Sequence, residues 1–94
     1  MKYTELKMGG KTYTDKSEIN KILKEKKLAW LIDSEIEHAR IEILNDTLIW
    51  HGGNFYSGNW RYGIFRGGVF FGTWHGGIFE AGEFEGRWLD GVRL

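Results

Sequence analysis

Apolar positions follow two different periods along this chain, and the first is the period of a helix. The apolar residues Ile19, Ile22 and Leu23 recur at the spacing of one helix face. Asp15 is followed three residues later by a glutamate, a pairing typical of a helix start. The pattern predicts a helix from about Ser17 to Lys27, with lysines in the last turns, where the helix dipole favours cations.

Short extended segments are expected on both sides of this helix. Tyr3 to Met8 and Lys11 to Thr14 flank Gly9-Gly10, and a Gly-Gly loop permits the positive φ angles of a tight β-hairpin turn. After the helix, LAWLID is an apolar run of strand length, while IEHARIEIL and TLIW are rich in β-branched residues. We expect these three segments to be strands that lead into the second half. The helix would then cover one end of the sheet, which a repeat array requires.

The second half has the period of strands and carries a repeat. The octet aromatic-x-Gly-x-Trp-x-x-Gly occurs three times at intervals of 14 residues. Its copies are YSGNWRYG (56–63), FFGTWHGG (70–77) and FEGRWLDG (84–91). Phe84, Gly86 and Trp88 are two apart and therefore share one face of a strand, while Glu85 and Arg87 face the other way. The glycine leaves a slot between two rings for an aromatic side chain of a neighbouring strand.

Two arrangements fit this repeat. Each 14-residue unit can form a strand, a turn and a returning strand, and stacked hairpins of this kind build a twisted antiparallel sheet. The aromatics also recur mostly every five residues, which suits a short β-solenoid of pentads with the rings inward. Four-residue steps from Phe70 to Trp74 and from Phe84 to Trp88 interrupt a strict pentad coil, so stacked hairpins are favoured. The chain is expected to be one continuous α+β domain, mostly β, with a hairpin-helix-strand cap at 1–50 and a repeat sheet at 51–94.

Composition restricts the classes of function. The 13 basic and 13 acidic residues balance, which weakens the case for a non-specific nucleic-acid binder, because that class needs a basic surplus. Cysteine is absent, so disulfides and thiolate chemistry are excluded. No stretch approaches the roughly 18 apolar residues of a membrane helix, and the N-terminus lacks the apolar region of a signal peptide. A cytoplasmic location is the default expectation.

Candidate catalytic and metal-binding residues form no recognisable pattern. His51 and His75 both follow a tryptophan in WHGG, but their separation is not a multiple of 14, and no carboxylate lies at a characteristic spacing from either. The glycine-rich GGNFYSG lacks the Gly-Lys-Ser/Thr of a phosphate loop, and no serine lies in a Gly-x-Ser-x-Gly turn. We therefore expect no enzyme activity, no catalytic residues, no metal site and no cofactor.

Several large side chains fall outside the inward set. Phe71 points opposite to its neighbours in the expected strand, and Tyr62 lies in a turn beside an arginine. Exposed tyrosine, phenylalanine and arginine are the residue types that anchor protein interfaces. The alternative is a second buried face, covered by the helix or by another copy of the chain. The residues predicted to bind a partner are Arg61, Tyr62, Arg66, Phe71 and His75.

The octet resembles the core of the MORN (membrane occupation and recognition nexus) repeat, which centres on Tyr-x-Gly-x-Trp-x-x-Gly. The matching residues are Tyr56, Gly58, Trp60 and Gly63; Phe70, Gly72, Trp74 and Gly77; and Phe84, Gly86, Trp88 and Gly91. MORN units are longer than 14 residues, so the chain is MORN-like only in this motif and only in its C-terminal half. It is also similar to small Trp/Gly-repeat proteins of tailed bacteriophages. Both resemblances imply an all-β platform for protein or lipid contact.

The favoured hypothesis is a non-catalytic protein-binding module, encoded by a phage, that occupies a site on a host protein in the host cytoplasm. Its most concrete form is an inhibitor of a bacterial defence system, such as an anti-CRISPR protein. One alternative is a repeat module that binds lipid headgroups or single-stranded nucleic acid through Arg61 and Arg66 or through the lysines between 21 and 27. The other is a self-associating structural subunit, for which a homodimer is plausible because three repeats are about the minimum for stability.

Overall fold

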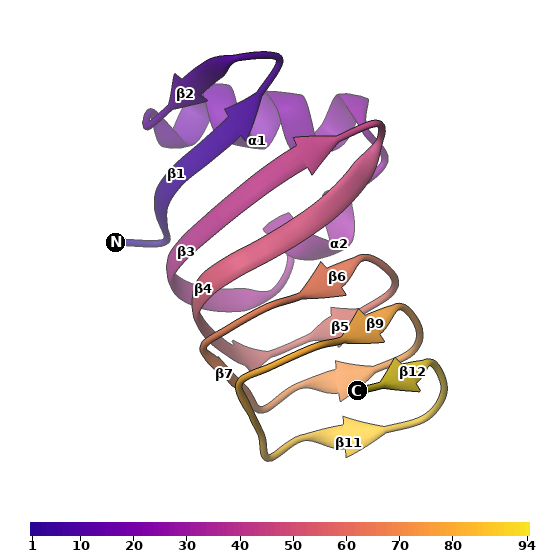
Figure 1. Ribbon diagram of the computed structural model, residues 1–94. Helices are drawn as coiled ribbons and strands as arrows, with labels where there is room; N and C mark the ends of the chain where they lie inside the picture. The colour runs from indigo at the N-terminus through magenta and orange to yellow at the C-terminus, as the bar shows by residue number, and fades with distance from the viewer.

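A long antiparallel hairpin joins the two halves of the molecule (Figure 1). The computed structural model describes residues 1–94. The hairpin consists of β3 (Glu35–Leu44) and β4 (Thr47–Ser57). Its turn residues Asn45 and Asp46 have φ angles of 50° and 59°, as a two-residue hairpin turn with left-handed backbone requires. Because β4 crosses from the predicted cap into the predicted repeat, it belongs to both parts.

The N-terminal segment adds two strands and a helix, as predicted. β1 (Tyr3–Met8) pairs with β2 (Lys11–Tyr13) in an antiparallel hairpin and with β3 in parallel. α1 (Lys16–Glu25) begins after Asp15, whose side chain accepts a hydrogen bond from the backbone N–H of Ser17. Its buried residues are Ile19, Ile22 and Leu23, which are the positions that the helical period selects.

The prediction of a strand for LAWLID was wrong, because this segment forms the short helix α2 (Ala29–Ile32). Lys27 adopts a left-handed φ of 61°, which ends α1 and turns the chain into α2. Leu28 and Leu31 are buried in the core, and Trp30 packs edge-on against Trp60 with ring centroids 5.2 Å apart. An apolar run of strand length also fits a buried helical turn, so its period alone does not decide between them.

Eight two-residue strands follow β4 and coil into a stack (Figure 1). They are β5 (Asn59–Trp60), β6 (Ile64–Phe65), β7 (Val69–Phe70), β8 (Thr73–Trp74), β9 (Ile78–Phe79), β10 (Glu83–Phe84), β11 (Arg87–Trp88) and β12 (Val92–Arg93). All of them pair in parallel, in three columns. One column continues from β4 through β6, β9 and β12, the second from β4 through β7 and β10, and the third contains β5, β8 and β11.

The prediction of a mostly β fold is therefore confirmed. The repeat half, however, forms the β-solenoid that was given as the alternative. The favoured prediction of stacked antiparallel hairpins was wrong, because the short strands pair in parallel. The four-residue steps that argued against coils form one side of each coil after the first. The chain advances by five, five and four residues from Trp60 to Phe65, Phe70 and Trp74. Because each coil repeats this irregularity, Trp60 and Trp74 still pair across coils.

The core of the repeat half consists of aromatic rings stacked in the same three columns. The stacked pairs are Trp50–Phe65 and Phe65–Phe79; Phe55–Phe70 and Phe70–Phe84; and Trp60–Trp74 and Trp74–Trp88. Rings of different columns meet edge-to-face, as in Phe65–Phe70 with centroids 5.8 Å apart and planes at 85°. The indole N–H groups of Trp50, Trp60 and Trp74 are buried without a hydrogen-bond partner, surrounded by these rings.

A glycine two residues before each inward ring after Trp50 allows the coils to stack closely. Gly68 has a φ of +95°, and a Cβ there would lie 2.0 Å from the carbonyl oxygen of Gly53 in the coil above. The slot expected from the sequence is real, but here it is filled by the backbone of the neighbouring coil rather than by an aromatic side chain. At Gly72 both the ring of Phe55 and the backbone of Gly58 fill it.

Candidate interaction surface

The residue that follows each short strand stands at a corner of the coil, outside the core. Arg61 and His75 follow β5 and β8, so they lie one coil apart on the same column, where the N–H of His75 donates to the carbonyl of Trp60. Arg66 follows β6 and Phe71 follows β7. The structure thus brings Arg61 and His75 together, and it places Arg66 and Phe71 at two other corners.

Tyr62, the remaining predicted residue, contacts the N-terminal cap. Its ring packs edge-on against Trp30 with centroids 5.7 Å apart, and its hydroxyl donates to the carbonyl of Lys27 at 3.2 Å. Although 42% of Tyr62 is exposed, these contacts connect the first coil to the chain between α1 and α2. Tyr62 therefore has a stabilising role that the sequence did not reveal.

Two of the polar corner residues contact the adjoining coil. Arg66 Nε lies 3.3 Å from Glu80 Oε1, and His75 Nε2 lies 2.9 Å from Asn59 Oδ1. Ion pairs at an exposed surface contribute little to stability, about 0–1 kcal/mol. The main effect of these two contacts is to hold the side chains of Arg66 and His75 along the axis of the stack.

Phe71 stacks on Tyr56, a residue missing from the predicted surface. The ring centroids are 6.2 Å apart with planes at 22°, and Phe71 and Tyr56 are 47% and 40% exposed.

Tyr56 was missed because the octet aligns it with Phe70, whereas the strand register pairs Phe55 with Phe70. The first coil is thus one residue longer than the later ones. The signal was present in the sequence as two adjacent aromatic pairs, Phe55-Tyr56 and Phe70-Phe71. We call Tyr56 and Phe71 the aromatic pair.

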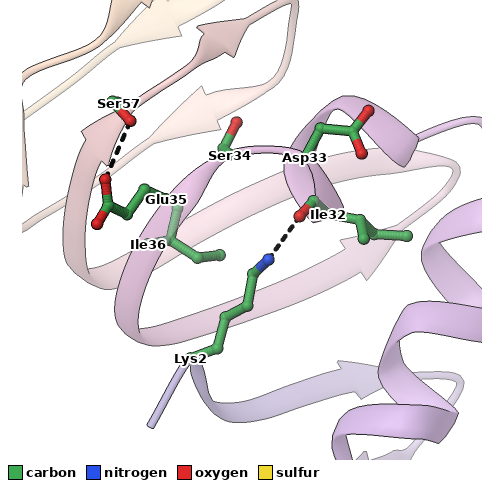
Figure 2. A pocket seen from close by; sticks show the side chains of 7 residues that line it. All are labelled: Lys2, Ile32, Asp33, Ser34, Glu35, Ile36 and Ser57. Carbon is green, nitrogen blue, oxygen red and sulfur yellow. Dashed lines mark hydrogen bonds between the residues drawn. The ribbon is translucent and has the colours of Figure 1, made fainter.

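A shallow hollow lies between the N-terminus, α2 and the start of β3 (Figure 2). Lys2 Nζ donates to the carbonyl of Ile32, and the pKa of Lys2 is lowered, chiefly by burial and further by the charge of Lys16. Ser57 Oγ donates to Glu35 Oε2 at 3.3 Å (Figure 2). Ser34, the one buried polar residue, donates to the carbonyl of Trp30. Of these three bonds, the one from Lys2 joins the N-terminal segment to α2.

One further pair of titratable side chains bridges the long hairpin. His51 Nε2 lies 2.8 Å from Glu42 Oε1 across β3 and β4. No group of three or more His, Cys, Asp or Glu side chains comes close enough to hold a metal ion.

Comparisons with models of protein families, with curated proteins and with solved structures found no match. Neither α1 nor α2 has the length and apolar character that a membrane crossing requires.

Proposed function

We propose that this protein is a non-catalytic protein-binding module whose contact surface is centred on Tyr56 and Phe71. The observation that supports this most is the exposure of two stacked rings at one corner of the solenoid. The core does not need them, because the inward columns are complete without either residue. Exposed aromatic side chains of this kind supply much of the binding energy at protein interfaces.

The backbone holds the aromatic pair in a fixed position before any partner binds. The N–H of Phe71 donates to the carbonyl of Phe55 at 2.8 Å, and Phe55 itself is fully buried. Tyr56 and Phe71 thus each directly follow a residue whose ring lies in the core, Phe55 and Phe70. A surface ordered in advance loses little conformational entropy on binding, which favours affinity.

The more specific form of this proposal is a phage-encoded inhibitor that acts on a host defence protein in the host cytoplasm, of the anti-CRISPR type. It rests on the similarity of the octet to Trp/Gly-repeat proteins of tailed phages and on the small size of the chain. A defence protein as the captured partner supports this form, whereas another partner leaves the broader proposal in place.

The test is retention of a partner from bacterial lysate on the immobilised protein, with and without nuclease. We expect one stoichiometric protein that survives nuclease and is lost from a Tyr56→Ser/Phe71→Ser variant. Leu89→Ser is the matched control, because Leu89 is similarly exposed but lies on the β11 column. Retention unchanged by the double substitution, or retention of nucleic acid alone, contradicts the proposal.

Self-association is a second candidate function, favoured by the last coil of residues 1–94. In the upper coils the carbonyl of each inward ring accepts a hydrogen bond from the next coil, as Phe70 does from the N–H of Glu85. In the last coil Phe84 and Trp88 are only partly buried, and Val92 and Leu94 are largely exposed. Light scattering that shows a constant monomer mass at all concentrations removes this candidate.

A further inference from the structure

Two rows of outward residues cross the strands beside the aromatic pair. In the first row the register pairs Glu37 with Asn54, Asn54 with Val69, and Val69 with Glu83. These residues alternate with buried neighbours such as Phe55, so they lie on the outer face of the sheet. This row therefore begins and ends with a glutamate.

The second row contains the rings themselves. Glu35 pairs with Ser57, the residue after Tyr56, and Phe71 lies at the equivalent corner one coil below. Glu85 follows β10 as Phe71 follows β7, and its N–H donates to the carbonyl of Phe70. This row also has a glutamate at each end. We call Glu35, Glu37, Glu83 and Glu85 the acidic border.

Most of the acidic border has no neutralising partner within the chain. Glu37 lies 3.3 Å from His38, and Glu35 accepts a hydrogen bond from Ser57. Glu83 and Glu85 form no ion pair and no side-chain hydrogen bond. The aromatic pair is therefore exposed between four glutamates, of which only Glu37 lies in an ion pair, and the chain as a whole is neutral.

We infer that the aromatic pair and the acidic border together bind an extended, positively charged segment of a partner protein. This inference rests on the proposed function and names the chemistry of its partner. Arginine or lysine side chains of that segment would lie over the faces of Tyr56 and Phe71, where the ring electrons attract a cation. Their neighbours in the segment would pair with the glutamates.

The acidic border argues against the other occupants of such a surface. The phosphates of a nucleic acid and the headgroups of anionic lipids are repelled by carboxylates. An uncharged apolar segment would cover the glutamates without pairing them, which is costly. The length of a row also fits a short segment. Three strand spacings of about 4.8 Å separate the two ends of a row, and four extended residues span roughly the same length.

The test measures binding of a fluorescent ten-residue peptide that alternates arginine and glycine, by anisotropy at low and physiological salt. One variant removes charge from the border (Glu83→Gln/Glu85→Gln), and a second removes the rings (Tyr56→Ser/Phe71→Ser). The matched control is Glu18→Gln/Glu25→Gln, which removes the same charge from the exposed surface of α1. The same peptide with glutamate in place of arginine checks for charge selectivity.

We expect the border and ring variants each to raise the Kd for the arginine peptide by about three- to tenfold, from lost ion pairs and cation–π contacts. The control should stay within about twofold of the unmodified protein, because its glutamates lie on another surface. No binding of the arginine peptide, an equal loss in the control, or no loss in the ring variant overturns the inference.

The partner retained from lysate separates this inference from the proposed function. If its affinity falls with the ring variant but not with the border variant, the partner uses the aromatic pair without a cationic segment. The proposed function then stands and the further inference fails. If neither variant changes its affinity, both fail.

Discussion

The indole of Trp74 lies flat beneath the indole of Trp60, with ring centroids 5.0 Å apart and planes at 8°. The two residues are 14 positions apart and belong to strands that pair in parallel register. Their stacking shows that the repeat is a stack of coils, because an antiparallel hairpin cannot place equivalent residues of successive units directly above one another.

Replacement of Trp74 should strongly destabilise the protein. The side chain is fully buried between Trp60 and Trp88, so Trp74→Ala leaves a large cavity, and such substitutions cost about 3–5 kcal/mol. The free energy of unfolding in urea measures the loss. Phe71→Ala is the control, since Phe71 is exposed on the same stack and should change stability by less than about 1 kcal/mol. Equal effects of both changes would mean that the inward columns are not the core.

Two adjacent glycines should respond very differently to alanine. Gly53 has a φ of +113°, and a Cβ there would lie 2.6 Å from the carbonyl oxygen of His38. Gly52 has an ordinary φ, and its Cβ would meet only Arg40, at 3.9 Å. Gly53→Ala should cost about 2 kcal/mol or more in the free energy of unfolding, whereas Gly52→Ala should be nearly neutral. Similar thermal unfolding curves for the two variants would contradict the close approach of β3 and β4.

Stability should fall at alkaline pH because of Tyr3. Burial raises the pKa of Tyr3 to about 12, and its hydroxyl donates to Asn20 Oδ1 at 2.8 Å. The unfolded chain loses this proton near pH 10, so between pH 10 and 12 the folded state holds more protons than the unfolded state. The free energy of unfolding therefore falls by about 1.4 kcal/mol per pH unit in this range. Below pH 10 this contribution is constant.

Tyr3→Phe is the matching control for the alkaline effect. The variant lacks the hydroxyl, so its stability should decline less steeply than that of the unmodified protein between pH 10 and 12. Thermal unfolding at several pH values in this range provides the comparison. Parallel curves would show that Tyr3 is not the responsible group.

Tyr62 should contribute to stability more than to binding. Tyr62→Ala removes the ring contact with Trp30 and the hydrogen bond to the carbonyl of Lys27, at an expected cost of about 1–2 kcal/mol. Tyr62→Phe keeps the ring and should recover part of the loss. A large change in partner binding with unchanged unfolding would instead assign Tyr62 to the interface.

The N-terminal half was largely predictable because its signals are local. Gly9 and Gly10 do adopt positive φ angles in the first turn, and Asp15 does cap α1. The exception is α2, whose four residues are too few for a period to be visible. The position of α2 depends on Trp30, whose ring packs against Trp60 at the end of the column formed by β5, β8 and β11. Trp30 and Trp60 are far apart in the sequence, so no local pattern could show this contact.

The interaction surface was predictable only in part. The alternation of the strands correctly placed Phe71 outside the core. It could not show that Tyr56 stacks on Phe71, because one extra residue in the first coil shifts the register. Nor could it show that glutamates from β3 and from the last coil border the same two rings, since strand pairing brings those segments together.

The sequence by itself determined most of the inward residues, where the glycines must be and that the repeated unit has 14 residues. These properties follow from the alternation of a strand and from the missing side chain of glycine, which act within a few residues. Only the tertiary structure decided that the units coil in parallel and which outer residues meet. The same alternation is satisfied by a hairpin and by a coil, and the close approach of backbones in successive coils selects between them.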